Sequence, residues 1–189
     1  MKTTIEQAVK ALKKGKTILY PTDTVWGLGC DATNSEAVKK IYNIKQRSES
    51  KALIVLLPSL DAVANHVQDI SPSIPEILEK AERPTTIIYP KAKNLAENLV
   101  AENGSIAIRM PNHDFCQQLL KAFGKPIVST SANISGEPTP SFFEEISEKV
   151  IEQVDFVVDY KLFAKKTKKK PLPSNILLIK ENGEILKLR

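Results

Sequence analysis

ALIVLL, residues 52–57, is an unbroken apolar run that begins after Lys51 and ends at Pro58. A strand with one face in water alternates apolar and polar residues, whereas a strand that is covered on both faces is continuously apolar. The run has the length of a strand and is too short for a buried helix. It therefore predicts a central strand in a sheet that carries helices on both faces.

Helical and extended patterns alternate outward from this strand. We expect helices at residues 4–15, 34–47, from about 59, from about 73, 95–100, 112–124 and 141–153. We expect strands at residues 17–20, 52–57, 85–89, 105–110, 126–130, 155–159, 174–179 and 184–188, with Asn-Gly turning the last pair into a hairpin. This order predicts an α/β fold, a twisted mixed sheet with flanking helices, in one domain that spans residues 1–189.

Capping residues predict where several helices begin and end. Residues 4–7 and 141–144 have the capping-box pattern, so a helix is expected to start at each. Asn112 is the expected cap of the helix that Gly124 ends.

The composition excludes a membrane protein and indicates a reducing compartment. Hydrophobic residues make up 42% of the 189 residues and charged residues 26%, which is ordinary for a soluble domain. The longest apolar stretch, residues 52–60, is too short to span a bilayer, and the N-terminus has no apolar signal segment. Cys30 and Cys116 lie far apart, as is typical of buried reduced thiols. We expect a cytoplasmic protein without a membrane partner.

The formal net charge of +5 comes from one segment. Residues 161–170 contain six lysines and no acidic residue, so the rest of the chain is close to neutral. Such a run is usually a solvated loop, and a nucleic-acid patch is the alternative. We expect a mobile cover that attracts anionic ligands through long-range, salt-screened forces.

Common catalytic signatures are missing from the sequence. It contains no G-x-x-x-x-G-K-[ST], G-x-G-x-x-G, G-x-S-x-G or H-E-x-x-H motif. His66 and His113 are its only histidines. Neither a Ser-His triad nor a metal site built from protein side chains is expected.

Four polar clusters lie next to predicted elements: PTDT at residues 21–24, KQRSESK at 45–51, Arg109, and STSANISG at 129–136. Turns, helix-end lysines and hydroxyl-capped turns explain part of each cluster. Because ligands of α/β sheets bind at strand ends, we expect the clusters to converge on one crevice. The cations, hydroxyls and amides suit a nucleoside triphosphate, and the first loop suits a small zwitterion.

Five segments, in order, resemble the YrdC/TsaC family of threonylcarbamoyl-AMP synthases. They are PTDTVWGLGCDA (21–32), IKQRSESKALIV (44–55), SIAIRMPNH (105–113), VSTSANISGEPTPS (128–141) and PSNI (173–176). The family's K-x-R and S-x-N signatures fall at residues 45–47 and 131–133. The resemblance covers nearly the whole chain and implies a YrdC/RibB-like fold with a concave basic cavity.

The resemblance also implies an activity and a site. L-Threonine, bicarbonate and ATP, with Mg²⁺ held by the ATP phosphates, would give threonylcarbamoyl-adenylate and pyrophosphate for the t6A modification of tRNA. The implied partners are tRNA or double-stranded RNA and the proteins that transfer t6A. The implied threonine-binding residues are Thr24, Arg109, Ser131 and Ser174. The implied ATP-binding residues are Arg47, Lys51, Asn133, Ser141 and Arg189, with Lys45 and Arg47 as the catalytic cations.

Three positions depart from the family pattern: Trp26 replaces a usual Tyr, Asn175 replaces a usual Thr, and Arg189 lies beside the terminal carboxylate, where family members usually continue. One alternative is a double-stranded RNA or tRNA-binding module of the same fold without adenylation, which the lysine run favours. Another is a paralogue of the YciO kind with the same fold and another or weaker activity, against which the intact K-x-R and S-x-N signatures argue.

Overall fold

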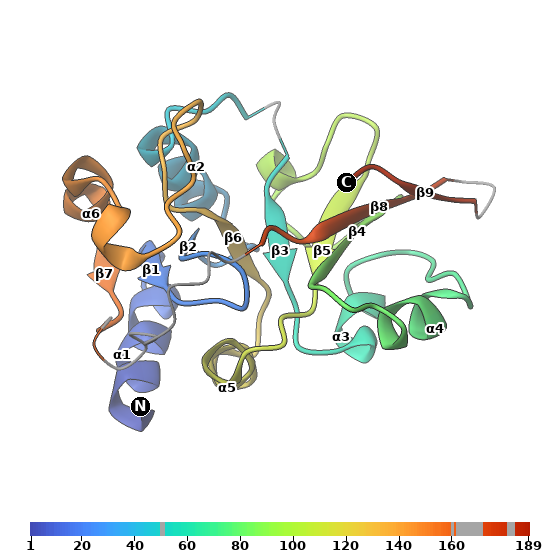
Figure 1. Cartoon of the computed structure of the whole chain (residues 1–189), viewed down its shortest axis with the longest axis horizontal. Coiled ribbons are helices and arrows are strands. Elements are labelled where there is room, and N and C mark those ends of the chain that lie inside the picture. The colour runs from blue at the N-terminus through green and yellow to red at the C-terminus, as the bar shows by residue number, and fades with distance from the viewer. Residues whose placement is uncertain (50–51, 160, 162–171, 181–183) are drawn as a thin grey trace.

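The predicted central strand lies in the middle of the sheet (Figure 1). The computed structural model describes residues 1–49, 52–159, 161, 172–180 and 184–189. Within these ranges, nine strands form one twisted sheet in the order β7-β1-β2-β6-β3-β5-β4-β8-β9. Strand β3 (Ile54–Leu56) pairs in parallel with β5 (Ile106–Arg109) and antiparallel with β6 (Ile127–Ser131). The mixed α/β sheet that the sequence predicts is confirmed.

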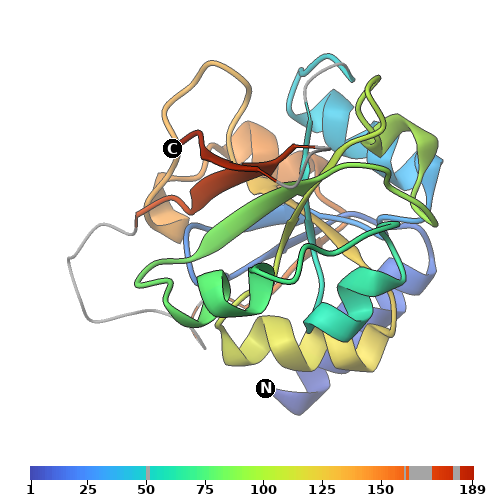
Figure 2. The same ribbon diagram turned by 90° about the vertical axis from the view of Figure 1, so that its right-hand side faces the viewer.

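Helices flank both faces of the sheet, as Figure 2 shows from the side. The other strands are β1 (Ile18–Tyr20), β2 (Gly27–Gly29), β4 (Thr85–Tyr89), β7 (Phe156–Val157), β8 (Asn175–Ile179) and β9 (Ile185–Lys187). The α-helices are α1 (Lys2–Lys13), α2 (Ser35–Ile44), α3 (Leu60–Ala64), α4 (Ile74–Glu79), α5 (Asp114–Phe123) and α6 (Glu148–Gln153). Two 3₁₀-helices, η1 (Glu97–Leu99) and η2 (Phe143–Glu145), complete the described elements.

Each face of the sheet buries its own hydrophobic cluster. Because successive strand residues point to opposite faces, Val55 and Leu56 belong to different clusters. Val55 packs with residues of α2, α3, α4 and α6, such as Ile41. Leu56 packs with residues of α1 and α5, such as Leu12 and Phe115.

The face with α1 and α5 carries a polar region beside its buried apolar cluster. Among the described residues, its buried cluster takes strand residues from β1, β3 and β6, and none from β4, β5 or β8. On the rest of this face, the cross-strand register places apolar residues such as Ile88 and Ile176, and beside them a region of small and polar residues. We call this region the polar floor; it comprises Gly27, Thr86, Arg109, Ser129 and Ser131.

Several predicted helix ends are wrong. Helix α1 already begins at Lys2, so residues 4–7 lie inside it. The helix expected from residue 141 begins at Glu148, because Phe142 is extended and η2 comes first. Helix α5 is preceded by His113 rather than by the expected cap Asn112. Gly124, with φ of +74°, ends this helix as predicted.

Strand β2 was not expected, because two of its three residues are glycine, which weakens a strand pattern. A Cβ on Gly29 would lie 2.0 Å from Val128 O, so only glycine allows β6 to approach this closely. The predicted pairing of β8 with β9 is confirmed, while its turn, residues 181–183, lies outside the described residues. The predicted lysine loop also lies outside them, apart from Lys161.

Candidate active site

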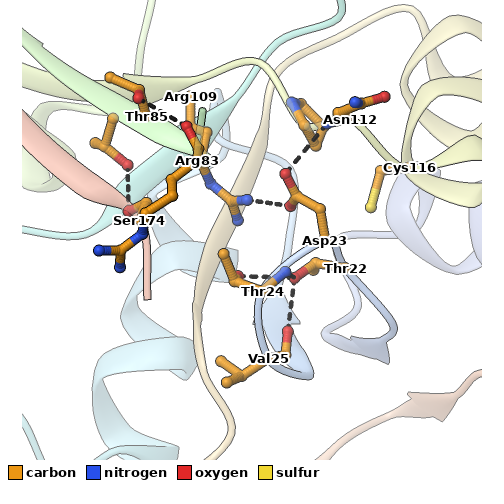
Figure 3. A network of polar contacts seen from close by, with 12 residues as sticks. Thr22, Asp23, Thr24, Val25, Arg83, Thr85, Arg109, Asn112, Cys116 and Ser174 are labelled. Carbon is orange, nitrogen blue, oxygen red and sulfur yellow. Dashed lines mark hydrogen bonds and ion pairs between the residues drawn. The ribbon is translucent and has the colours of Figure 1, made fainter. Parts of the chain in front are cut away.

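The loop between β1 and β2 reaches β5, where Asp23 contacts Arg109 (Figure 3). It leaves the sheet after Tyr20 and returns at Gly27, which are opposite each other in the strand register. The Cys116 thiol donates to Pro21 O at 3.2 Å, which joins the start of the loop to α5. The backbone N–H of Asn112 donates to Asp23 Oδ2 at 3.2 Å. These contacts hold the predicted PTDT cluster over the sheet.

Arg109 and Asp23 form a buried ion pair between β5 and this loop. Arg109 Nη1 donates to Asp23 Oδ1, and the two side chains are 4% and 8% exposed. Arg109 Nε is also buried and has no hydrogen-bond acceptor among the described residues. A guanidinium carries five N–H donors, so one carboxylate cannot satisfy it. The Arg109 side chain can therefore donate a hydrogen bond to an oxygen atom of a ligand.

A chain of hydroxyl contacts continues through the loop. Thr22 Oγ1 lies 2.6 Å from Val25 O and 3.0 Å from Thr24 Oγ1, and Thr24 N donates to it at 3.1 Å. Figure 3 shows Thr24 on the same side of the loop as Arg109. The three hydroxyl and backbone contacts fix the loop that carries Thr24.

The far edge of the polar floor brings Ser174 near Arg109. Thr86 is opposite Arg109 in the register of β4 and β5, and its Oγ1 lies 2.8 Å from Ser174 Oγ in a buried contact. Arg189 Nε donates to Ser174 O at 3.1 Å. Two of the predicted threonine-binding residues, Arg109 and Ser174, are thus linked through Thr86.

Lys45 forms the other corner of the candidate site. It ends α2, is 2% exposed, and its Nζ donates to Ser131 O at 2.6 Å and to Asn133 O at 2.8 Å. Burial, and then the positive charge of Arg47, lower the pKa of Lys45 to about 8. Because the two carbonyls bind the ammonium, Lys45 ties α2 to the segment that follows β6.

Asn133 lies beside this ammonium with one unsatisfied atom. Its Nδ2 donates to Ile134 O and Glu137 O, both at 2.9 Å. Its Oδ1 is buried and has no donor within the described part of the chain. A buried oxygen without a donor needs an explanation, and a ligand N–H or O–H would supply one.

Two further predicted ATP-binding residues, Arg47 and Ser141, have hydrogen bonds to nearby segments of the chain. Arg47 Nη2 donates to Ala52 O at 2.9 Å. The backbone N–H of Ser141 donates to Glu145 Oε2 at 2.8 Å. Lys51 lies outside the described residues. The predicted basic cavity therefore stays a prediction.

Sequence reasoning assigned no individual role to Asp23 or Thr86. Asp23 was seen only as part of a polar loop, because its partner Arg109 is 86 residues away. Thr86 has a usable signal: it lies in a strand next to apolar residues, where a buried hydroxyl needs a partner. Trp26, which departs from the family pattern, packs edge-on against Phe143 with ring centroids 4.9 Å apart.

Other buried groups do not supply a nucleophile or a metal site. Burial raises the pKa of the Cys116 thiol and of the Cys30 thiol, so both are neutral at physiological pH. In the described ranges, no three His, Cys, Asp or Glu side chains gather where they could hold a metal ion. None of the helices described is both long and apolar enough to cross a membrane.

Comparisons with known proteins agree with the geometry. The protein-family model Sua5_yciO_yrdC, described as "Telomere recombination", matches residues 10–188. The threonylcarbamoyl-AMP synthase of Pseudoalteromonas translucida is 38% identical over 162 residues, which are 83% of this chain and 86% of the relative.

Solved structures have the same fold. Sua5 of P. abyssi, in complex with L-threonine, has a TM-score of 0.86 and 26% identity over 98% of this chain. The match covers 53% of that protein, so the chain spans about half the length of this relative. YciO of E. coli has a TM-score of 0.84 at 24% identity, over 100% of this chain and 89% of that one, and supports the fold alone.

Proposed function

The chain belongs to the Sua5/YciO/YrdC family, and from this premise we propose that it is an L-threonylcarbamoyladenylate synthase. The substrates are L-threonine, bicarbonate and ATP, and the products are threonylcarbamoyl-AMP and pyrophosphate. The adenylate serves the t6A modification of tRNA. The enzyme acts in the cytoplasm as one domain over residues 1–189.

The reaction needs no covalent enzyme intermediate. The threonine amine combines with bicarbonate to give a carbamate and water. A carbamate oxygen then forms a bond to the α-phosphorus of ATP, and the bond from that phosphorus to the pyrophosphate oxygen breaks. The protein contributes positioning and charge neutralisation, which are the main terms in phosphoryl-type transfer.

The observation that carries the proposal is the buried Arg109 with its unsatisfied Nε beside Thr24. An arginine binds carboxylates through paired donors, and Asp23 occupies only Nη1. The threonine carboxylate takes the remaining donors, while Thr24, Ser131 and Ser174 contact the rest of the amino acid.

ATP binds toward the Lys45 corner. Lys45 and Arg47 neutralise the charge that develops on the transferring phosphate and on pyrophosphate. The unsatisfied Asn133 Oδ1 accepts from the nucleotide. Lys51, Ser141 and Arg189 complete the ATP contacts, and Mg²⁺ enters on the ATP phosphates rather than on protein ligands.

The experiment is pyrophosphate release by the purified protein with ATP, Mg²⁺, bicarbonate and L-threonine, with the adenylate identified by mass spectrometry. We expect release to require every substrate. Release without threonine, or no release at saturating substrates, would contradict the proposal. A module that only binds RNA would retain tRNA and release no pyrophosphate, and the names of the relatives do not favour it.

A further inference from the structure

The hydrogen bonds of Thr22 determine the direction of its contact with Thr24. Thr22 Oγ1 is 2.6 Å from Val25 O, and a carbonyl oxygen can only accept. Thr22 therefore gives its single hydroxyl proton to Val25. In the contact of 3.0 Å between the two hydroxyls, Thr22 must then accept, and Thr24 must donate.

The acceptor capacity of Thr22 is also fully used. A hydroxyl oxygen has two lone pairs, and Thr24 supplies both donors, its backbone N–H at 3.1 Å and its hydroxyl. Thr22 is 7% exposed, so no water is needed to complete its contacts. Its bonding is satisfied within the loop.

Packing prevents Thr22 from exchanging its methyl and hydroxyl positions. A Cβ on Gly27 would lie only 3.1 Å from Thr22 Cγ2, so the methyl group packs directly against this glycine. β-Branched side chains have few χ1 rotamers, and rotation would place the hydroxyl away from Val25. The orientation of the Thr22 hydroxyl is therefore held by packing as well as by bonds.

Thr24 consequently has only lone pairs left for a ligand, because its proton is committed to Thr22. Resting on the proposed function, we infer that Thr22 is a positioning residue that fixes Thr24 as a hydrogen-bond acceptor toward the amino acid. The threonine subsite then selects a substrate with a donor at this point. L-Threonine has two such donors, its side-chain hydroxyl and its amino group. The amino group keeps one N–H when it becomes the carbamate.

The test compares two methylated analogues, each of which lacks one donor. O-Methyl-L-threonine lacks the hydroxyl proton, and N-methyl-L-threonine gives a carbamate without an N–H. Pyrophosphate release gives kcat/KM for each analogue relative to L-threonine in the same enzyme preparation. This ratio does not depend on the folded fraction of a variant.

One of the two analogues lacks the donor that bonds to Thr24. For that analogue, we expect the kcat/KM of the wild type to be lower than for L-threonine by about 10²-fold or more. Thr22→Val frees the Thr24 hydroxyl to rotate, so this rejection shrinks about tenfold and KM for L-threonine rises. Thr22→Ser keeps the hydroxyl and retains the rejection. Steric rejection of the added methyl would be the same in all three proteins.

Equal use of both analogues and L-threonine by the wild type would overturn the inference. The inference would also be overturned if Thr22→Val rejected the analogue as strongly as the wild type does, or if Thr22→Ser no longer rejected it. Absence of threonine-dependent release in the wild type would instead refute the proposed function itself.

Discussion

Removal of the Asp23 carboxylate is expected to destabilise the fold strongly. Asp23→Ala leaves the Arg109 guanidinium buried at 4% exposure without its ion-pair partner. Breaking a buried pair in this way costs about 3–5 kcal/mol, a large part of the stability of an ordinary domain. With a urea m-value of about 2 kcal/mol/M, the unfolding midpoint falls by about 1.5–2.5 M.

An exposed ion pair in the same chain provides the matched control. Glu76 and Lys80 form an i,i+4 contact at 2.6 Å, with side chains 68% and 74% exposed. Such pairs contribute about 0.3–0.5 kcal/mol, so Glu76→Ala shifts the midpoint only slightly. The assay is urea unfolding of each variant followed by circular dichroism.

A double variant separates the stranded charge from lost packing. Asp23→Ala with Arg109→Met removes both charges, and we expect it to unfold at higher urea than Asp23→Ala alone. If Asp23→Ala shifts the midpoint no more than Glu76→Ala, the pair is screened by water and the reasoning fails. The same conclusion follows if the double variant is no more stable than the single one.

Four further predictions concern charge and selectivity. Arg47→Ala should lower kcat/KM for pyrophosphate release by about 10²–10³, and unchanged turnover would remove Arg47 from the site. Valine should replace threonine far less well than serine does, because valine leaves hydrogen-bonding groups unpaired; equal rates with valine and threonine would contradict the proposed threonine-binding residues. The pKa of Lys45 is about 8 in the fold and ordinarily 10.5, so the unfolded chain binds more protons between these values and the free energy of unfolding should rise with pH across this range. Urea titrations should show this rise in the wild type and a smaller one in Lys45→Met. Replacing the lysines of residues 165–170 with Ser should weaken ATP capture at low salt with little change in kcat, and a salt-independent fall in kcat would place one of them on the phosphate.

The sequence was sufficient where one local pattern determines the structure. The run at residues 52–57 predicted the central strand, and helices were expected from residue 34 and from about residue 59. In the structure, Asn34 caps α2 through a bond from Ala37 N at 3.1 Å. Ser59 likewise caps α3. At residues 141–144 the same type of signal failed, because Glu145 rather than Glu144 binds the Ser141 backbone and the helix starts later.

The site was less predictable because its contacts join distant segments. The polar clusters were visible, but Asp23 and Arg109 are 86 residues apart, and Lys45 meets the Asn133 carbonyl across 88 residues. No local periodicity encodes such pairs. The resemblance placed Lys45 among the catalytic cations, but no local pattern indicated that its ammonium would be buried and bonded to two carbonyls of the segment that follows β6.

Gly27 explains why fold and site cannot be separated in this chain. Its register partner is Ser131, whose carbonyl oxygen accepts from Lys45 Nζ, a predicted catalytic cation. A side chain here would meet Thr22 Cγ2 and Ser129 Oγ, both at 3.1 Å, so its other side supports the loop that carries Thr24. The glycine weakens β2 as a sequence signal, yet its lack of a side chain lets the loop and the sheet approach closely at this point. A residue with poor strand propensity therefore lies between the loop that carries Thr24 and the strand residue whose carbonyl binds Lys45.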